Sequence, residues 1–153
     1  MTRFVWSKEY ELGIDVIDHQ HQRIVDYINR VYDCLESGSS NVSEKEILLN
    51  LVDYTFSHVA FEEAMLEEID YSEIAVHRLS HQSFSRVIND LKEWVEQGEK
   101  VGKELANFLQ NWLIAHIMVE DAKYVDEVNS SLAYGDPLAE PGQTRQAHWK
   151  DIQ

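Results

Sequence analysis

Histidines dominate the residues of this chain that could do chemistry, and two of their spacings are those of metal-binding helices. His77 and His81 are four residues apart, and Glu62 follows His58 at the same interval. Residues four apart on an α-helix are offset by roughly 40°, so their side chains converge on one side. Unprotonated imidazole nitrogen and ionised carboxylate oxygen, placed together in this way, suit iron, zinc or manganese. The pattern therefore indicates a metal site.

Five of the seven histidines lie on the apolar stripes of segments with helical spacing: His21, His58, His77, His81 and His116. One buried histidine is more often a hydrogen-bonded core residue than a ligand. Five of them in a metal-free core would leave many polar groups unsatisfied. A single ion cannot easily use five histidines as well as carboxylates, whereas two ions that share bridging carboxylates can. The residues alone therefore predict a dinuclear, histidine-rich site.

Four segments must position these histidines, and each shows apolar residues at helical spacing. They cover about residues 14–36, 43–69, 72–97 and 102–130. Gly38 suits the position just past the first helix, and Ser43 with Glu46 forms a capping box that is expected to open the second. Because the connections are short, neighbouring helices should be antiparallel. The predicted fold is all-α, an up-down-up-down antiparallel four-helix bundle.

The expected domain covers residues 1–130 and consists of an N-terminal arm, residues 1–13, followed by the bundle, residues 14–130. The arm contains the apolar residues Phe4, Val5 and Trp6 and is expected to pack on the bundle. Residues 131–153 form a C-terminal extension that is expected to be flexible, to fold back on the bundle, or to bind a partner. Trp149 favours docking of some kind.

Charge and composition exclude several classes of function. The chain has 153 residues, which fits one domain, and its net charge of −15 would repel DNA and RNA. No apolar run approaches the roughly 20 residues of a membrane-spanning helix, and the N-terminus lacks the apolar core of a secretory signal. The single cysteine, Cys34, excludes an intrachain disulfide. We therefore expect a cytoplasmic protein that inserts into no membrane and binds no nucleic acid.

Four short stretches resemble motifs of the hemerythrin family in its bacterial form. GIDVIDHQHQRIVDYIN resembles the opening of the family, HVAFEE its HxxxE segment, HRLSH its HxxxH segment, and WLIAHIMVED its WLxxHIxxxD segment. The motifs occur in the family's order and with similar spacings, over about residues 4–130. In combination they are highly specific, and the resemblance implies a di-iron protein that binds O₂ reversibly.

The resemblance also implies seven ligands for two iron ions, which a solvent-derived oxo or hydroxo group would join. One iron would be held by three histidines and be coordinatively full, whereas the other would have two histidines and an open position. The ligands would be His77, His81 and His116 on the first iron, His21 and His58 on the second, and Glu62 and Asp121 as bridges.

In the family, O₂ binds at the open iron, takes one electron from each iron together with the bridge proton, and is held as hydroperoxide. Reversible binding then requires a dry apolar pocket. By resemblance, the residues that line this pocket would be Ile24, Val59, Trp112, Leu113 and Ile117. Tyr124, one turn past Asp121, would contribute to the same region. NO and small anions are further candidate ligands of the open iron.

Three functions remain open from the sequence. The first, which we expect, is an oxygen carrier, store or supplier without enzymatic activity. The second is a sensor of O₂ or NO that acts through the arm or the C-terminal extension. The third is a di-iron enzyme that consumes peroxide, repairs iron centres or acts as an oxidase. Ferritin-like oxidases use carboxylate-rich sites with ExxH pairs. This chain has no ExxH, and its histidine-rich site favours binding.

Two adjacent acids, Glu120 and Asp121, are alternative partners of His116. Regular helix geometry favours Glu120, offset by roughly 40°, over Asp121, offset by roughly 140°. The family pattern favours Asp121. Helix geometry and the family pattern are reconciled if the helix is locally widened, because a wider turn brings Asp121 to the same face as His116. We therefore predict a π-bulge between His116 and Asp121. Glu120 would then face outward or toward a neighbouring helix.

Three further polar residues are expected not to bind metal. His19 lies roughly 200° around the helix from His21 and should be exposed. Asp18 suits the start of the first helix, where carboxylates are favourable. His148 lies in the C-terminal extension.

Overall fold

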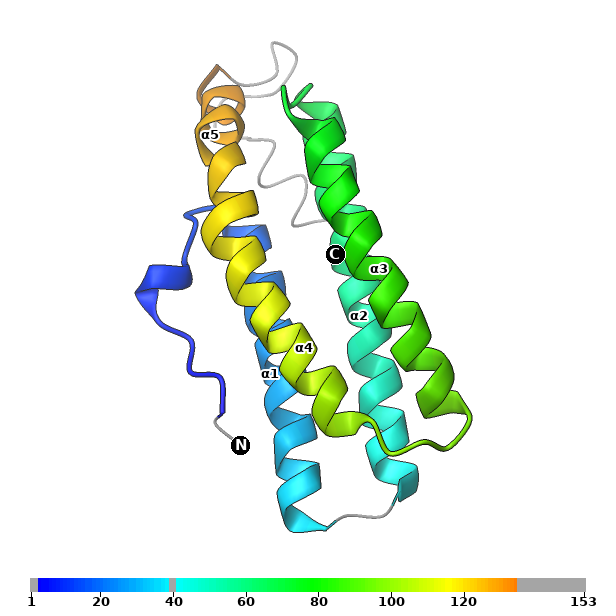
Figure 1. The fold of residues 1–153 in the computed structure, drawn as a ribbon. Coiled ribbons are helices and arrows are strands. Elements are labelled where there is room, and N and C mark those ends of the chain that lie inside the picture. The colour runs from blue at the N-terminus through cyan, green and yellow to red at the C-terminus, as the bar shows by residue number, and fades with distance from the viewer. Residues whose placement is uncertain (1–2, 39–40, 135–153) are drawn as a thin grey trace.

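The computed structural model describes residues 3–38 and 41–134, which form a bundle of four long helices (Figure 1). The helices are α1 (Asp15–Ser37), α2 (Asn41–Glu68), α3 (Ile74–Glu96) and α4 (Gly102–Ala115). The chain continues directly from α4 into η2 (His116–Asp121), η3 (Ala122–Tyr124) and α5 (Val125–Tyr134). No strand occurs among the described residues. Consecutive helices run in opposite directions, which confirms the predicted all-α four-helix bundle.

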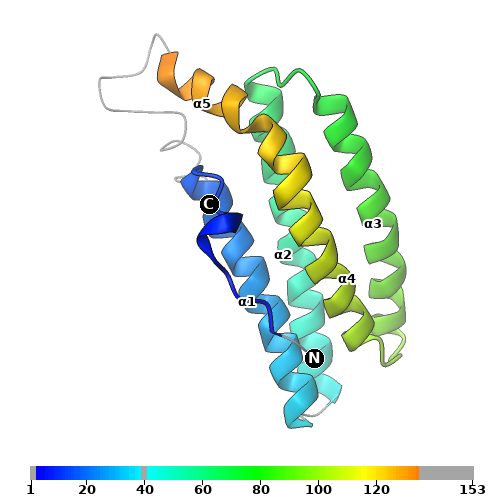
Figure 2. The same ribbon diagram turned by 60° about the vertical axis from the view of Figure 1, so that its left-hand side comes forward.

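The helices pack side by side in the order that short connections predict. α1 lies against α2 and α4, and α2 lies against α3. Seen from the side, α5 leans toward the beginning of α1 (Figure 2). The bundle therefore brings one face of each helix to a common core, which is what a site built from four helices requires.

The helix ends agree with the sequence to within a few residues. Gly38 has a left-handed backbone conformation with φ 67°, and its N–H donates to Cys34 O, which ends α1 as predicted. α2 begins at Asn41, so the prediction that Ser43 opens this helix is wrong by two residues. The last helical stretch reaches Tyr134, a few residues beyond the predicted end near Ser130. The extension from residue 135 onward lies outside the described residues.

The N-terminal arm is held on α1 by specific contacts. Phe4 is buried, its N–H donates to Asn29 Oδ1 at 2.9 Å, and Asn29 Nδ2 donates back to Phe4 O at 2.9 Å. Trp6 is partly buried against the same core. The prediction that the arm packs on the bundle is thus confirmed, through Phe4 and Trp6. The Val5 side chain points to solvent and is 77% exposed, since neighbours in an extended segment face opposite sides.

Two apolar clusters fill the core, and polar residues separate them. In α1, Ile24 belongs to the larger cluster and Ile17 to the smaller one, with His21 between them. In α2, Val59 and Met65 belong to the larger and smaller clusters respectively, and Glu62 lies between them. The polar layer is therefore closed by apolar side chains on both sides, which keeps bulk water away from it.

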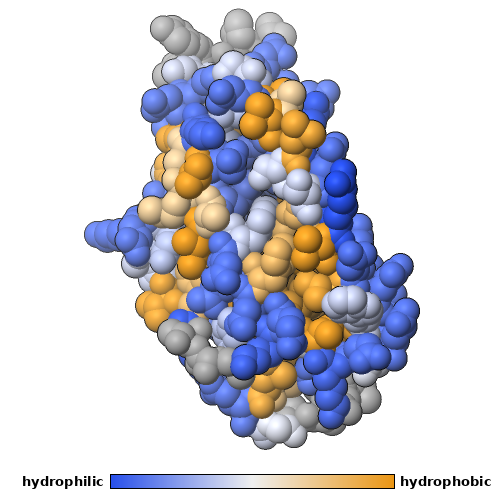
Figure 3. All heavy atoms as spheres, in the orientation of Figure 1, coloured by the Kyte–Doolittle hydropathy of each residue, from blue (hydrophilic) through white to orange (hydrophobic). Residues whose placement is uncertain are grey.

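The surface mixes hydrophilic residues with apolar patches, as Figure 3 shows for one face. The exposed large apolar side chains of the described residues include Val76, Leu79, Val87 and Trp94 from α3, and Met118 and Val119 from η2. Within the described ranges, no helix combines the length and the apolar character that a bilayer span needs.

Candidate metal centre

Seven titratable side chains from the four helices meet in the polar layer, and none is more than 2% exposed. They are His21, His58, Glu62, His77, His81, His116 and Asp121. The structure thus brings together every residue that the sequence predicts as a metal ligand. The bundle achieves this because the helical spacing that buries the apolar stripes also turns these residues inward.

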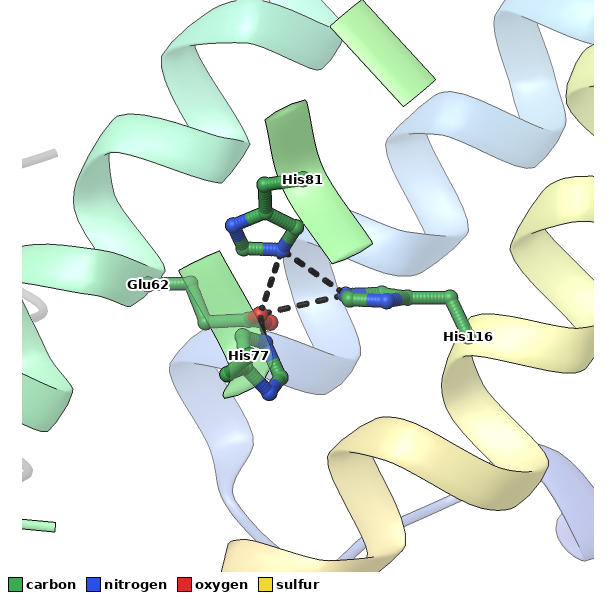
Figure 4. A group of neighbouring side chains, drawn as sticks. All are labelled: Glu62, His77, His81 and His116. Atoms are coloured by element: carbon green, nitrogen blue, oxygen red, sulfur yellow. Dashed lines mark hydrogen bonds and ion pairs between the residues drawn. The ribbon is translucent and has the colours of Figure 1, made fainter. Parts of the chain in front are cut away.

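Three histidines converge on one oxygen of Glu62 (Figure 4). The Nε2 atoms of His81 and His116 each lie 3.1 Å from Glu62 Oε1, and His77 Nε2 contacts the same oxygen. The Nε2 atoms of His81 and His116 are 3.3 Å apart. His116 Nε2 also lies 2.8 Å from Asp121 Oδ1. Five ligand-type atoms therefore surround one point.

The other two histidines face the remaining oxygens of the same two acids. His58 Nε2 lies 3.4 Å from Glu62 Oε2, and His21 Nε2 lies 3.1 Å from Asp121 Oδ2. These four ligand atoms all fall within 4.8 Å of one another. This two-histidine group is adjacent to the three-histidine group. Each carboxylate directs one oxygen to each group, which is the arrangement of a bridging ligand.

The helix that carries His116 and Asp121 is widened between them. Residues His116–Asp121 form a π-helical turn, which confirms the predicted bulge. The wider turn returns position i+5 to the side of His116 and places Asp121 at the centre. Glu120 faces outward, 3.9 Å from Lys123 Nζ, with 26% of its side chain exposed. Asp121 is therefore the partner of His116, as the family pattern indicates.

Several atoms of the centre are buried without a hydrogen-bond partner among the described residues. They are both ring nitrogens of His21, Nε2 of His58, Nδ1 of His81 and of His116, and both carboxylate oxygens of Asp121. A buried polar atom without a partner is costly and rare. A cation within the two-histidine group would engage His21 Nε2, His58 Nε2 and Asp121 Oδ2 at once. The donor set therefore fits a metal ion.

The acid–base balance of the centre also fits a cation. Burial alone raises the pKa of Glu62, but the adjacent His116 and hydrogen bonds from other histidines hold it well below its usual range. Burial lowers the pKa of His116, but Asp121 and Glu62 outweigh burial and raise it to about 10. Burial dominates at His58 and lowers its pKa, against the pull of Glu62. The carboxylate of Glu62 is thus held in its charged form, and the centre favours positive charge.

Three side chains make polar contacts with the centre from outside. Gln20 Oε1 lies 2.6 Å from His58 Nδ1, and Glu63 Oε2 lies 3.4 Å from His81 Nδ1. Tyr124 donates its O–H to Glu62 Oε2 at 3.2 Å, which agrees with its predicted place near the site. Burial raises the pKa of Tyr124 well above its usual value, so the phenol remains a donor.

The sequence reasoning gave no role to Gln20 or Glu63. A signal existed for Gln20, because it occupies the apolar stripe of α1 between Ile17 and Ile24, where an amide needs a partner. Glu63 gave no such signal, since an acidic residue that directly follows a ligand on a helix ordinarily faces solvent.

The predicted O₂-pocket residues surround the centre on its larger apolar side. Four of them, Ile24, Val59, Leu113 and Ile117, are buried in one cluster. The fifth, Trp112, is only partly buried, and its ring stacks on the His116 ring with centroids 4.4 Å apart. Their role as a pocket for O₂ remains a prediction.

Two polar residues near the start of α1 lie apart from the metal centre, as predicted. Asp18 accepts the N–H groups of Leu12 and Gly13 at 2.8 and 3.0 Å, which ties the arm to the helix start. His19 is exposed. His148, predicted not to bind metal, lies outside the described residues.

Comparisons with known proteins agree with this geometry. The family described as "Hemerythrin HHE cation binding domain" matches residues 12–128. The bacteriohemerythrin of Pseudomonas aeruginosa is 40% identical over 133 residues, which are 87% of this chain and 86% of that protein. Myohemerythrin-1 of Phascolopsis gouldii is 26% identical over 121 residues, 79% of this chain and 91% of that protein. A crystal structure of wild-type hemerythrin matches with a TM-score of 0.77 and 26% identity, covering 83% of this chain and 98% of that chain.

Proposed function

The chain belongs to the hemerythrin family, and from this premise we infer that it binds O₂ reversibly at a di-iron centre within the bundle. The observation that carries the proposal is the division of the buried ligand atoms into two adjacent groups. Five Nε2 atoms and the four oxygens of Glu62 and Asp121 supply donors for two ions. Nitrogen and oxygen donors of this kind suit iron.

We assign the two groups to different roles. The three-histidine group, His77, His81 and His116, would fill the coordination of one iron together with the bridges. The two-histidine group, His21 and His58, offers fewer protein ligands and leaves room for O₂. When bound, the iron pair supplies the redox chemistry by which O₂ is taken up and released.

The protein's own part is to hold the ligands rigidly and to keep water out. Glu62 is fixed by Tyr124, and Asp121 is fixed by the π-helical turn. Ile24, Val59, Leu113 and Ile117 close the layer on one side with side chains that carry no proton donor. A dry surrounding of this kind favours release of O₂ over loss of a reduced oxygen species to solvent. Five histidines beside two carboxylates favour binding over catalysis.

Reversible O₂ binding gives a direct test. The iron-loaded protein is reduced without air, O₂ is admitted, and the visible spectrum is recorded. We expect about two irons per chain and an absorption band that appears with O₂, persists, and disappears on degassing. Rapid conversion to the ferric form with release of peroxide, or fewer than two irons in well-loaded protein, would overturn the proposal. Rapid consumption of added peroxide would favour a di-iron enzyme instead.

Shortening Leu113 is expected to weaken the exclusion of water. The Leu113→Ala variant removes a fully buried side chain beside His116, so we expect a loss of about 2–5 kcal/mol in the free energy of unfolding and faster autoxidation of the O₂ form. Leu109→Ala is the matched control, because Leu109 is equally buried one turn farther from His116. It should lose comparable stability with an unchanged autoxidation rate. Equal rates in the two variants would contradict the pocket assignment.

A further inference from the structure

One histidine of each group has an oxygen atom behind its ring, from an amide at His58 and from a carboxylate at His81. We propose that Gln20 is a positioning residue that fixes His58 through an uncharged contact and leaves the iron of the two-histidine group with the weaker electron donation of the pair. The inference rests on the proposed di-iron function and concerns how the chain makes its two iron positions unequal.

Gln20 is built into the core for this contact. Its residue is only 4% exposed, although it carries an amide, and it precedes His21 directly in α1. Its Oε1 lies 2.6 Å from Nδ1 of His58, which comes from α2. Gln20 thus links the two helices that supply the two-histidine group, one residue away from one ligand and in contact with the other.

The contact selects one tautomer of His58. Its Nε2 faces Glu62 Oε2 and the other ligand atoms, so it must present a lone pair to a metal ion. Nδ1 then carries the ring proton and donates it to Gln20 Oε1. An oxygen acceptor behind a ligating histidine fixes the orientation of its ring in this way. Without an acceptor at position 20, the buried Nδ1–H would be left without its partner.

One histidine of the three-histidine group has a carboxylate behind its ring. His81 Nδ1 lies 3.4 Å from Glu63 Oε2, which is close enough for electrostatic attraction although no hydrogen bond joins the two atoms, and Glu63 is partly exposed. A carboxylate draws more strongly on a ring proton than a neutral amide does, which makes the imidazole a stronger donor to its metal. The three-histidine group therefore has both more histidines and the carboxylate. The two-histidine group has an amide, so its iron is less favoured in the ferric state.

A single change of charge tests the idea. The Gln20→Glu variant keeps an acceptor of the same length and adds a negative charge behind His58. We expect it to bind two irons and to show a lower midpoint potential in an anaerobic redox titration. Glu63→Gln removes the charge behind His81 and is expected to raise the midpoint potential. Gln22→Glu is the matched control, because Gln22 is exposed on the same helix and should leave the potential unchanged.

The effect of removing the contact between Gln20 and His58 can be measured with zinc in place of iron. Gln20→Leu, titrated with Zn²⁺ in a calorimeter, is expected to bind one of two ions roughly 10–100-fold more weakly than the unmodified protein. In the zinc-loaded unmodified protein, ¹⁵N NMR is expected to place the ring proton of His58 on Nδ1. A proton on Nε2 would overturn the proposal even where Gln20→Glu fails to fold.

The outcomes separate this inference from the proposed function. A Gln20→Glu variant that binds two irons and has the same midpoint potential as Gln22→Glu would refute the role of Gln20. The potentials are measured without O₂, so that result would leave reversible O₂ binding intact. Failure of the unmodified protein to bind O₂ reversibly would overturn the proposed function and leave the potential comparison standing.

Discussion

Replacing Glu62 with glutamine is expected to remove both metal ions from the protein. Glu62 directs its two oxygens to different histidine groups, with Oε1 near His81 and His116 and Oε2 near His58. Glutamine has the same shape, but it offers one oxygen and a nitrogen that only donates hydrogen bonds. The variant would direct a donor group at one set of imidazoles and lose the negative charge that attracts the cations.

The loss should appear in both metal content and stability. A metal present at about 1,000 times its dissociation constant stabilises a folded protein by about 4 kcal/mol. For a chain of this size that corresponds to a melting temperature lower by on the order of 10 °C in the variant. Metal analysis and thermal unfolding, followed by circular dichroism, measure the two effects.

Glu67→Gln is the matched control for this variant. Glu67 lies on the same helix, its side chain is 73% exposed, and it pairs with Arg78 at the surface. We expect two irons per chain and a nearly unchanged melting temperature, because exposed ion pairs contribute little. A Glu62→Gln protein that kept two irons would contradict the bridging role and would move the centre elsewhere in the bundle.

The fold and the ligands could be predicted because they rest on patterns that repeat along the chain. Apolar residues at helical spacing define four helices, and His77 with His81 falls on the inward side of one of them. Helical periodicity fixes which side is inward, and short connections fix the order of the helices. The ligand set needed the family pattern as well, since spacing alone favours Glu120 over Asp121.

What the sequence left open depends on contacts between helices. Gln20 in α1 contacts His58 in α2, and the spacing of residues within α1 does not indicate this partner. The arm was expected to pack, but the residues that do so were not specified: an extended arm alternates its faces, so Phe4 and Trp6 take the inward side and Val5 is exposed. The start of α2 lies at Asn41, two residues before the predicted one. Such choices are decided by packing.

The second large effect is expected from Asp121→Asn, compared with Glu120→Gln in the preceding residue. Asp121 directs Oδ2 to His21 and Oδ1 to His116, so asparagine would lose a donor in one group and place an amide N–H against an imidazole. We expect at least one iron to be lost, with a fall in affinity above the roughly 100-fold that outer contacts produce. Glu120→Gln changes only a partly exposed pair with Lys123 and should keep both irons.

This pair of variants tests the π-helical turn as well as the ligand. In a regular α-helix the residue four positions after His116 would face the centre, and Glu120→Gln would be the damaging change. In the widened turn Asp121 faces the centre in place of Glu120, because the turn holds one residue more between the two ligands. Met118 and Val119 then lie at the surface. Iron retained by Asp121→Asn and lost by Glu120→Gln would therefore mean that the helix is regular in the metal-loaded protein. The opposite result requires that the widened turn persists when the metal is bound.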